Sequence, residues 1–476
     1  MRRIGADVIV VGAGVVGRSL AFELASRAPE LRVVLSGRRG AGASEAAGAM
    51  LGALGEVTAA ALATRHGRLR VELAVEAAGR WPQWRRRVRE ALARPVGDGY
   101  GTGTFVLLNA VGSVLDERSF AAIARAGHEF GVPVEEVEPA EVPALRPLDN
   151  DRALRAMHLP AEGFLDARRW LASLDAALAA LPNVTRVPSA TLQADGSGYL
   201  LRGRGGRFTA PTVVVAAGAW TVPLVEALDP DLTLMPVATA EGTALTVTAP
   251  LPLPAVLRTP NRAYACGLHA VPQADGTWYL GATAAPALAP GDAPHLGGVR
   301  FLLDAALGQL HHGLAAARLR RTHHGNRPIG LDGHPLLGAT GRPGLWVATG
   351  THRDGLHASP LIAEELASEI LDGNSSPWLA PWRPEREPIS DWTLDDAVAE
   401  AAAHHQALAA ETRMRPPLTG AWPQALADSY HQQLAAAYAR LPDGFVLPPE
   451  LAPLAYEHTS ALAKVLDSFQ QRRFRR

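Results

Sequence analysis

Unbroken apolar runs give the clearest strand predictions in this chain. Residues 8–11 read Val-Ile-Val-Val and residues 212–215 read Thr-Val-Val-Val. A strand that is buried on both faces, as in a parallel sheet, produces a continuous β-branched run of this kind. Residues 15–26 then predict a helix, and residues 31–35 a second strand. This strand–turn–helix–strand pattern indicates the beginning of a parallel α/β sheet.

Three glycines occupy the turn and the first helical residues of this unit, at Gly12, Gly14 and Gly17. Gly12 allows a tight turn, Gly14 lets the backbone approach a pyrophosphate, and Gly17 permits close packing of helix on strand. The free amides at the helix N-terminus favour phosphate groups. The pattern predicts a dinucleotide site, with a purely structural glycine turn as the alternative.

The end of the second strand departs from the usual dinucleotide pattern. An acidic residue that binds the adenosine ribose is expected there, but the chain has Leu35 and Ser36, followed by Arg38 and Arg39. Ser36 can still hydrogen-bond a hydroxyl group. Arginines here suggest a 2′-phosphate in a nicotinamide enzyme, contact with adenine in a flavoprotein, or a solvated turn, and all three interpretations stay open.

The last 100 residues show a different pattern. Prolines and tryptophans alternate over residues 377–388, and three helices are predicted after them: residues 395–412, a helix opened by Pro423, and one carrying Leu462, Val465, Leu466 and Phe469. A stabilising cap on the rest of the molecule is the simplest interpretation. Dimerisation, docking of a partner protein and a lid over the site are the alternatives.

Composition and charge exclude several classes of protein. The 476 residues contain 46 basic and 47 acidic side chains, which argues against a chain-wide nucleic-acid or membrane-surface role. The start Met1-Arg2-Arg3 resembles a signal peptide, but Asp7 and the glycine turn argue against one. No segment approaches the roughly 18 apolar residues of a membrane span, so we expect a cytoplasmic protein.

Single residue types narrow the chemistry further. With one cysteine, Cys266, the chain can form neither an internal disulfide nor a CxxC metal site, and Lys464 is its only lysine, which disfavours Schiff-base catalysis. Histidines occur as adjacent pairs at 311/312, 323/324 and 404/405, a spacing that suits one metal ion poorly. We therefore expect no metal.

Five motifs in order resemble the D-amino-acid-oxidase family of flavoproteins, most closely its glycine oxidase and ThiO branch. They are the glycine turn, the Ser-Glu-Ala-Ala-Gly-Ala-Met-Leu loop at 44–51, Ala-Ala-Gly-Ala-Trp at 216–220, Arg-Pro-x-x-x-Asp-Gly-x-Pro at 327–335, and Gly-x-x-Arg-Asp-Gly at 350–355. The resemblance covers about residues 5–375. It implies FAD as cofactor, and noncovalent attachment, since no cysteine lies near Arg327.

The resemblance also implies an α/β architecture with a discontinuous Rossmann-like FAD-binding domain, a substrate domain with a mixed sheet, and the C-terminal helical extension. We expect the FAD-binding domain in residues 1–89, 151–225 and 326–375. The substrate domain is expected in residues 90–150 and 226–325, and the linker and helical extension in 376–476.

Site residues are carried over by the same resemblance. Arg327 corresponds to the cation that clamps the substrate carboxylate, with a salt bridge to Asp332 as the structural alternative. Arg353 and His352 lie in the turn that faces the flavin. His269 stands where the family commonly has a tyrosine, and Cys266 is expected to be a small core residue. The candidate cofactor-binding residues are Gly12, Gly14, Val16, Gly17, Ser36, Arg38, Ser44, Glu45, Ala47, Met50, Val187, Gly218, Trp220, Arg327, Gly350, Arg353, Asp354, Gly355 and Leu356.

The implied activity is oxidation of glycine, an N-substituted glycine or a small amino acid to an imine by hydride transfer to flavin. Hydrolysis then yields glyoxylate or a 2-oxo acid plus an amine, and molecular oxygen becomes hydrogen peroxide. The His269 departure favours a specialised substrate, such as a larger N-carboxymethyl amine or hydrazine. The alternatives are a dehydrogenase that passes electrons to a quinone or a partner protein, and a non-enzymatic flavin-binding scaffold. Expected partners are a small amino-acid or amine substrate and molecular oxygen, and the C-terminal helices are candidates for homo-oligomerisation or docking of a partner.

Overall fold

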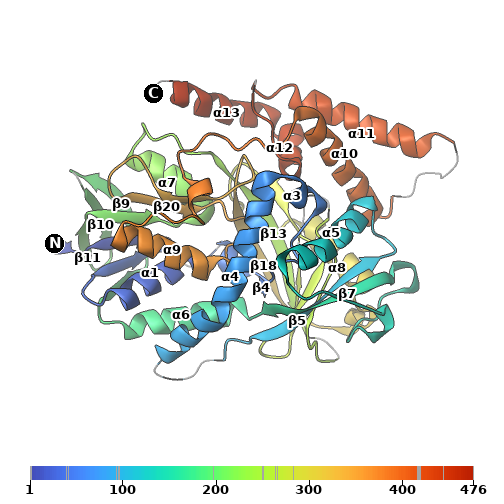
Figure 1. Ribbon diagram of the computed structural model, residues 1–476, viewed down its shortest axis with the longest axis horizontal. Coiled ribbons are helices and arrows are strands. Elements are labelled where there is room, and N and C mark those ends of the chain that lie inside the picture. The colour runs from blue at the N-terminus through green and yellow to red at the C-terminus, as the bar shows by residue number, and fades with distance from the viewer. Residues whose placement is uncertain are drawn as a thin grey trace.

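Three sheets and the helices around them form the body of the molecule (Figure 1). This computed structural model describes residues 3–474 except 39, 41, 93, 95, 96, 197, 249, 250, 263, 265, 282, 415–419 and 443. Within the described residues no helix is both long and apolar enough to cross a membrane.

A six-stranded sheet contains the glycine turn. In spatial order its strands are β19 (Leu336–Ala339), β20 (Leu345–Thr349), β12 (Thr212–Val215), β2 (Val8–Val11), β3 (Val33–Ser36) and β8 (Val184–Val187). All neighbours are parallel except β19 and β20. Val8 and Val10 pack into the core on one face and Ile9 into the core on the other. Burial on both faces explains the unbroken apolar run, and the predicted α/β fold is confirmed.

Helices cover one face of this sheet and a second sheet lies on the other side. On the helical face α1 (Val15–Arg27) packs against α6 (Ala167–Ala180) and α9 (Ser359–Asp372), with α4 (Arg65–Glu90) outside them. The opposite face carries α7 (Thr221–Leu228) and a four-stranded sheet. Its strands are β1 (Arg3–Gly5), β11 (Gly206–Ala210), β10 (Gly198–Gly203) and β9 (Ala190–Asp195).

The third sheet has ten strands and mixed pairing. Its main path is β17 (Ala285–Ala287), β13 (Val237–Val247), β16 (Trp278–Gly281), β15 (His269–Pro272), β14 (Val256–Arg258), β5 (Gly101–Asn109), β7 (Ala153–Phe164) and β4 (Met50–Leu51). β18 (Leu319–Gly330) pairs with β13, and β6 (Glu135–Val137) with β7. Val106 packs beneath α5 (Val114–Phe130), whereas Leu107 packs with α8 (Leu296–Gln309) on the other face.

Two strands of this sheet bear on the expected domain boundaries. β7 falls within the segment 151–225 that we expected in the FAD-binding domain, yet it pairs with β5 along most of its length. β18 runs past residue 325 while still paired with β13. We therefore propose to place these two boundaries after Phe164 and after Gly330. The division into domains stays a proposal.

The C-terminal extension consists of α10 (Leu394–Glu411), α11 (Trp422–Tyr438), the short α12 (Ala452–Glu457) and α13 (Thr459–Phe474), across the top of Figure 1. The three long helices match the predicted ones. Leu434, Leu462 and Phe469 are buried in the same core as Ile329 of β18. The extension is therefore packed on the body, as a cap would be, and its role in docking or dimerisation stays a prediction.

A buried ion-pair cluster joins the extension to the rest of the chain. Arg262 lies in the loop after β14, and its side chain is 2 % exposed. Its Nε donates to Asp116 at the start of α5, while Nη1 donates to Gln309 at 2.8 Å and to Glu411 of α10 at 3.1 Å. Glu411 is itself buried, and burial raises its pKa to about 7.

Replacing Arg262 with alanine should destabilise the protein by about 3–5 kcal/mol, because Asp116 and Glu411 then lie buried without their cation. Thermal unfolding followed by circular dichroism measures the loss. Arg300→Ala is the matched control, since Arg300 is 86 % exposed and its ion pair with Asp304 should contribute at most about 0.5 kcal/mol. Equal unfolding temperatures for the two variants would show that the cluster does not hold the extension.

Candidate active site

A cavity of about 630 Å³, called the main cavity below, opens where the six-stranded sheet meets the ten-stranded one. Val11, Ser36 and Thr349 line it at the ends of β2, β3 and β20, and Ala216 follows β12. Parallel α/β sheets bind ligands outside the carboxyl ends of their strands. The main cavity therefore lies where the fold predicts a binding site.

The glycine turn forms the closed end of this cavity. A Cβ on Gly12, whose φ is +122°, would lie 2.1 Å from the carbonyl oxygen of Ala216, and one on Gly17 would lie 1.8 Å from that of Gly12. Side chains are thus excluded at both positions by backbone. A Cβ on Gly14 would meet only Ser44 Oγ, at 3.2 Å, so the backbone there faces the cavity. These features form a cradle for a pyrophosphate at the start of α1.

Most of the predicted cofactor-binding residues line the main cavity. They are Gly12, Gly14, Val16, Ser36, Arg38, Ser44, Ala47, Met50, Gly218, Trp220, Arg327, Arg353, Asp354, Gly355 and Leu356. Gly17, Glu45, Val187 and Gly350 are not among the lining residues. At Gly17 and Gly350, glycine is instead required by the surrounding backbone. Gly350 has φ +74°, and a Cβ there would lie 3.0 Å from Pro335. Arg39 lies outside the described residues, so the three interpretations given for it above all remain.

Arg327 provides a cation for the cavity. It lies on β18, opposite Ala240 of β13, and its Nη1 donates to the carbonyl of Thr283 at 3.0 Å. Asp332, the alternative salt-bridge partner, is instead bound by Arg386 at 2.7 Å. Among the described residues no carboxylate lies within ion-pair distance of Arg327. A half-buried cation without a counter-ion among the described residues is suited to binding an anionic ligand.

His269 faces the same region as a neutral ring. Its Nδ1 lies 2.8 Å from the carbonyl oxygen of Gly267, and since a carbonyl can only accept, Nδ1 carries the proton. Burial lowers the pKa of His269 to about 4. Nε2 is therefore an acceptor, directed toward Gly48 and Gly281. His269 can receive an N–H from a ligand, but at neutral pH it carries no charge for a carboxylate.

The turn after β20 places Arg353 between two carboxylates. Glu56 Oε2 and Glu450 Oε1 each lie 3.9 Å from its guanidinium nitrogens, and its Nε has no hydrogen-bond partner. The side chain is only 9 % exposed. Neighbouring His352 has φ +50°, and burial next to Arg353 holds its pKa well below the usual range. The Asp354 carboxylate accepts a hydrogen bond from Arg70 at 2.7 Å.

Cys266 is buried, as expected of a small core residue, and it also lines the main cavity. The loop that carries it ends at β15, so Cys266 and His269 reach the cavity together.

Sequence reasoning missed several lining residues: Glu56, Tyr279, Asn326, Thr351 and His357. Tyr279 donates its hydroxyl proton to the carbonyl of Ala46 at 2.6 Å, and burial raises its pKa. It stands on β16, and its ring lies beside that of His269 on the neighbouring β15. Asn326 directly precedes the Arg-Pro motif, whereas no local signal marks Glu56.

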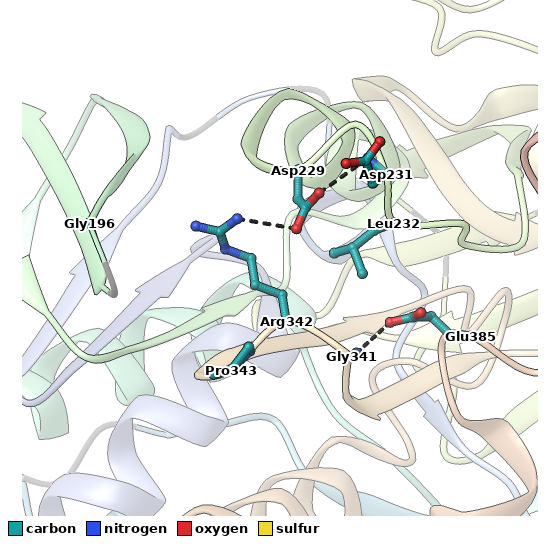
Figure 2. Close-up of a pocket in the computed structure, with 8 residues that line it drawn as sticks. All are labelled: Gly196, Asp229, Asp231, Leu232, Gly341, Arg342, Pro343 and Glu385. Carbon is teal, nitrogen blue, oxygen red and sulfur yellow. Dashed lines mark hydrogen bonds and ion pairs between the residues drawn. The ribbon is translucent and has the colours of Figure 1, made fainter. Parts of the chain in front are cut away.

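A second, shallower pocket of about 520 Å³ lies away from these residues (Figure 2). Figure 2 shows Arg342 pointing toward Asp229, which it binds at 3.1 Å, and Glu385 accepting from the backbone of Gly341. No group of three or more histidine, cysteine or acidic side chains in the described part of the chain is arranged to hold a metal ion. The four candidate catalytic residues, Arg327, Arg353, His269 and His352, all line the main cavity instead.

Comparisons with known proteins agree with this geometry. A family model described as FAD dependent oxidoreductase matches residues 7–369. Glycine oxidase of Geobacillus kaustophilus is 31 % identical over 382 residues, which cover 79 % of this chain and 96 % of that protein. Glycine oxidase of Pseudomonas putida is 27 % identical over 392 residues, covering 80 % and 98 %.

Solved structures show the same fold. The crystal structure of the Geobacillus kaustophilus glycine oxidase has a TM-score of 0.69 at 29 % identity and covers 81 % of this chain and 100 % of that one. Iminodiacetate oxidase from Chelativorans sp. BNC1 has a TM-score of 0.65 at 22 % identity, covering 80 % and 100 %, and shares the fold.

The chain therefore belongs to the D-amino-acid-oxidase family of FAD-dependent oxidoreductases, and its cofactor is FAD. The main cavity fits this cofactor, because its glycine cradle accepts a pyrophosphate and the cavity continues from there to Arg327 and Arg353. The family match ends at residue 369, so the helices of the C-terminal extension lie beyond it.

Replacing Gly14 with alanine should weaken FAD binding at least about tenfold while the protein still folds. The added methyl group meets only the flexible Ser44 hydroxyl but occupies the surface where the pyrophosphate approaches. Flavin content after purification and titration of the apoprotein with FAD measure the effect. Gly79→Ala in α4 is the control, since nothing lies within 4 Å of its Cβ. An unchanged dissociation constant in Gly14→Ala contradicts the cradle.

Proposed function

We propose that this chain oxidises glycine or an N-substituted glycine to the corresponding imine. The observation that carries the proposal is Arg327, a cation that lines the main cavity and has no carboxylate partner within the described residues. Its planar guanidinium can bind a substrate carboxylate through two hydrogen bonds, which a lysine could not do. The glycine oxidase relatives support the same class of substrate.

The reaction breaks the Cα–H bond and releases one N–H proton, and a C=N bond forms. FAD, when bound, accepts the hydride from Cα. Arg327 orients the carboxylate, and Nε2 of neutral His269 accepts an N–H of the substrate, which fixes the direction of the nitrogen. Water then hydrolyses the released imine to glyoxylate and an amine. We propose molecular oxygen as the final electron acceptor, reduced to hydrogen peroxide, and a cytoplasmic location.

Removing the Arg327 side chain tests this proposal. Arg327→Ala should retain its flavin absorption bands, whereas kcat/KM for glycine and sarcosine falls at least about 100-fold, because about 3 kcal/mol of carboxylate binding is lost. Arg327→Lys should lose less, since the charge remains. Arg320→Ala is the control, because Arg320 lies exposed on the same strand.

The measurement is the bleaching of the flavin bands after anaerobic addition of glycine or sarcosine. Undiminished bleaching in Arg327→Ala rejects the assigned role of this residue, and bands that persist in the wild type with both substrates reject glycine oxidation. Admission of air then measures reoxidation. Reoxidation slower than turnover with an artificial acceptor would identify a dehydrogenase instead of an oxidase.

A further inference from the structure

A residue of the C-terminal extension reaches the charged groups of the main cavity. Glu450 lies in the 3₁₀ turn Pro449–Leu451, which connects α11 to α12 and lies 81 residues beyond the end of the family match at 369. Its Oε1 is 3.9 Å from Nη2 of Arg353. No hydrogen bond joins Glu450 to any other described side chain, so this ion pair is its one close polar contact within the described residues.

The position of Glu450 is held by its neighbours. Leu447 and Leu451 are 0 % and 1 % exposed, and the hydroxyl of Tyr438 donates to the carbonyl of Leu447 at 2.9 Å. Pro448 packs on Gly333, where a Cβ would lie 3.1 Å from it. This packed turn thus holds the Glu450 carboxylate close to Arg353.

The charges around Arg353 balance when Glu450 is included. Arg258 binds Glu56 at 2.8 Å and Arg70 binds Asp354 at 2.7 Å, so these two arginines already have their carboxylates. Of the two carboxylates near Arg353, Glu450 is the one that no other described arginine binds. Glu162, beyond Arg258, accepts hydrogen bonds from the backbone of Leu54 and Gly55, and burial raises its pKa, which favours the uncharged carboxyl group.

Arg38, which also lines the main cavity, is exposed, so the half-buried cation whose charge no described carboxylate compensates is Arg327. One substrate carboxylate satisfies it. A second carboxylate, on the nitrogen substituent, would have to compete with Glu450 and Glu56 for Arg353, and like charges at close range oppose binding.

We propose that Glu450 is a specificity-determining residue that neutralises Arg353 and thereby restricts the enzyme to substrates with a single carboxylate. The proposal rests on the proposed function for its substrate class. Removing the charge of Glu450 should free Arg353 to bind a second carboxylate. The expected substrates are therefore glycines with an uncharged nitrogen substituent rather than iminodicarboxylates.

The test compares two substrates that differ by one carboxylate, sarcosine and iminodiacetate, on the full chain with FAD. The wild type should favour sarcosine in kcat/KM, and Glu450→Gln should shift the ratio toward iminodiacetate by about tenfold or more. Glu450→Asp, which keeps the charge, should retain the wild-type preference. Glu457→Gln, at an exposed glutamate of α12, is the matched control and should leave the ratio unchanged.

A binding measurement separates this inference from the proposed activity. Methylthioacetate and thiodiacetate carry sulfur in place of the oxidisable nitrogen and differ by one carboxylate, so their dissociation constants from flavin difference spectra report recognition alone. Glu450→Gln should tighten thiodiacetate about tenfold relative to methylthioacetate. The role of Glu450 is overturned if Glu450→Gln and the wild type have the same ratio of dissociation constants for the two sulfur compounds and the same ratio of kcat/KM for the two substrates.

Failure of the proposed activity has a different signature. If neither glycine nor sarcosine reduces the wild-type flavin, the proposed function fails, while the two sulfur compounds still decide the role of Glu450. If Glu450→Gln does not fold, Glu450→Met, which also removes the charge and keeps the side-chain length, takes its place in both measurements. Retained preference for the monocarboxylate in that variant likewise overturns the inference.

Discussion

Direct contact between backbone segments at the glycine turn is the constraint on which the rest of the structure depends. At three glycines there, a Cβ added to the residue would lie closer to a neighbouring backbone atom than real contacts allow. These distances are 2.1 Å at Gly12, 1.8 Å at Gly17 and 2.3 Å at Gly37. Side chains could shift to relieve such overlap, but the main chain of a packed sheet cannot. These contacts bring the ends of β2, β3 and β12 to one point. The cradle for the cofactor follows directly from that convergence.

The cavity beyond this cradle is organised by charge pairing. Removing ions from water is expensive, so buried arginines normally have a carboxylate beside them. The buried Arg258 and the partly buried Arg70 and Arg386 follow this rule with Glu56, Asp354 and Asp332. Arg327 does not, although it lies in the same part of the molecule. This exception is informative because the neighbouring arginines obey the rule. We propose that Arg327 marks the place where the ligand supplies the negative charge.

The first unit of the fold could be predicted from sequence because its signals are local. The residues of β2, α1 and β3 are contiguous, and the apolar runs and glycines that define them lie within 36 residues. Arg327 could be found because it lies in a motif. Glu56 and Glu450 could not, since each becomes part of the site through a fold contact with Arg353, some 300 and 100 residues away in the chain. The partner of Asp332 was missed for the same reason, because Arg386 comes from the linker.

The C-terminal extension contacts both the body of the molecule and the loop that leads to the main cavity. A cap would need only apolar contacts, such as those of Leu434 and Leu462. The extension also binds the loop that leads to the cavity: His404 of α10 accepts the backbone N–H of Tyr264 at 2.9 Å, and Tyr264 donates its hydroxyl to Ala401. Tyr264 has φ +55°, a conformation that a non-glycine residue adopts only when its surroundings enforce it.

Two residues further along, Cys266 lines the main cavity, and the loop continues to His269. The extension therefore holds the wall that carries these two residues, while Glu450 contacts Arg353 through the adjoining turn. Because both effects come from one packed unit, a change in the packing of α10 to α12 is expected to alter the shape and the charge of the cavity together. Stability and substrate selection are thus coupled in this chain through the same helices.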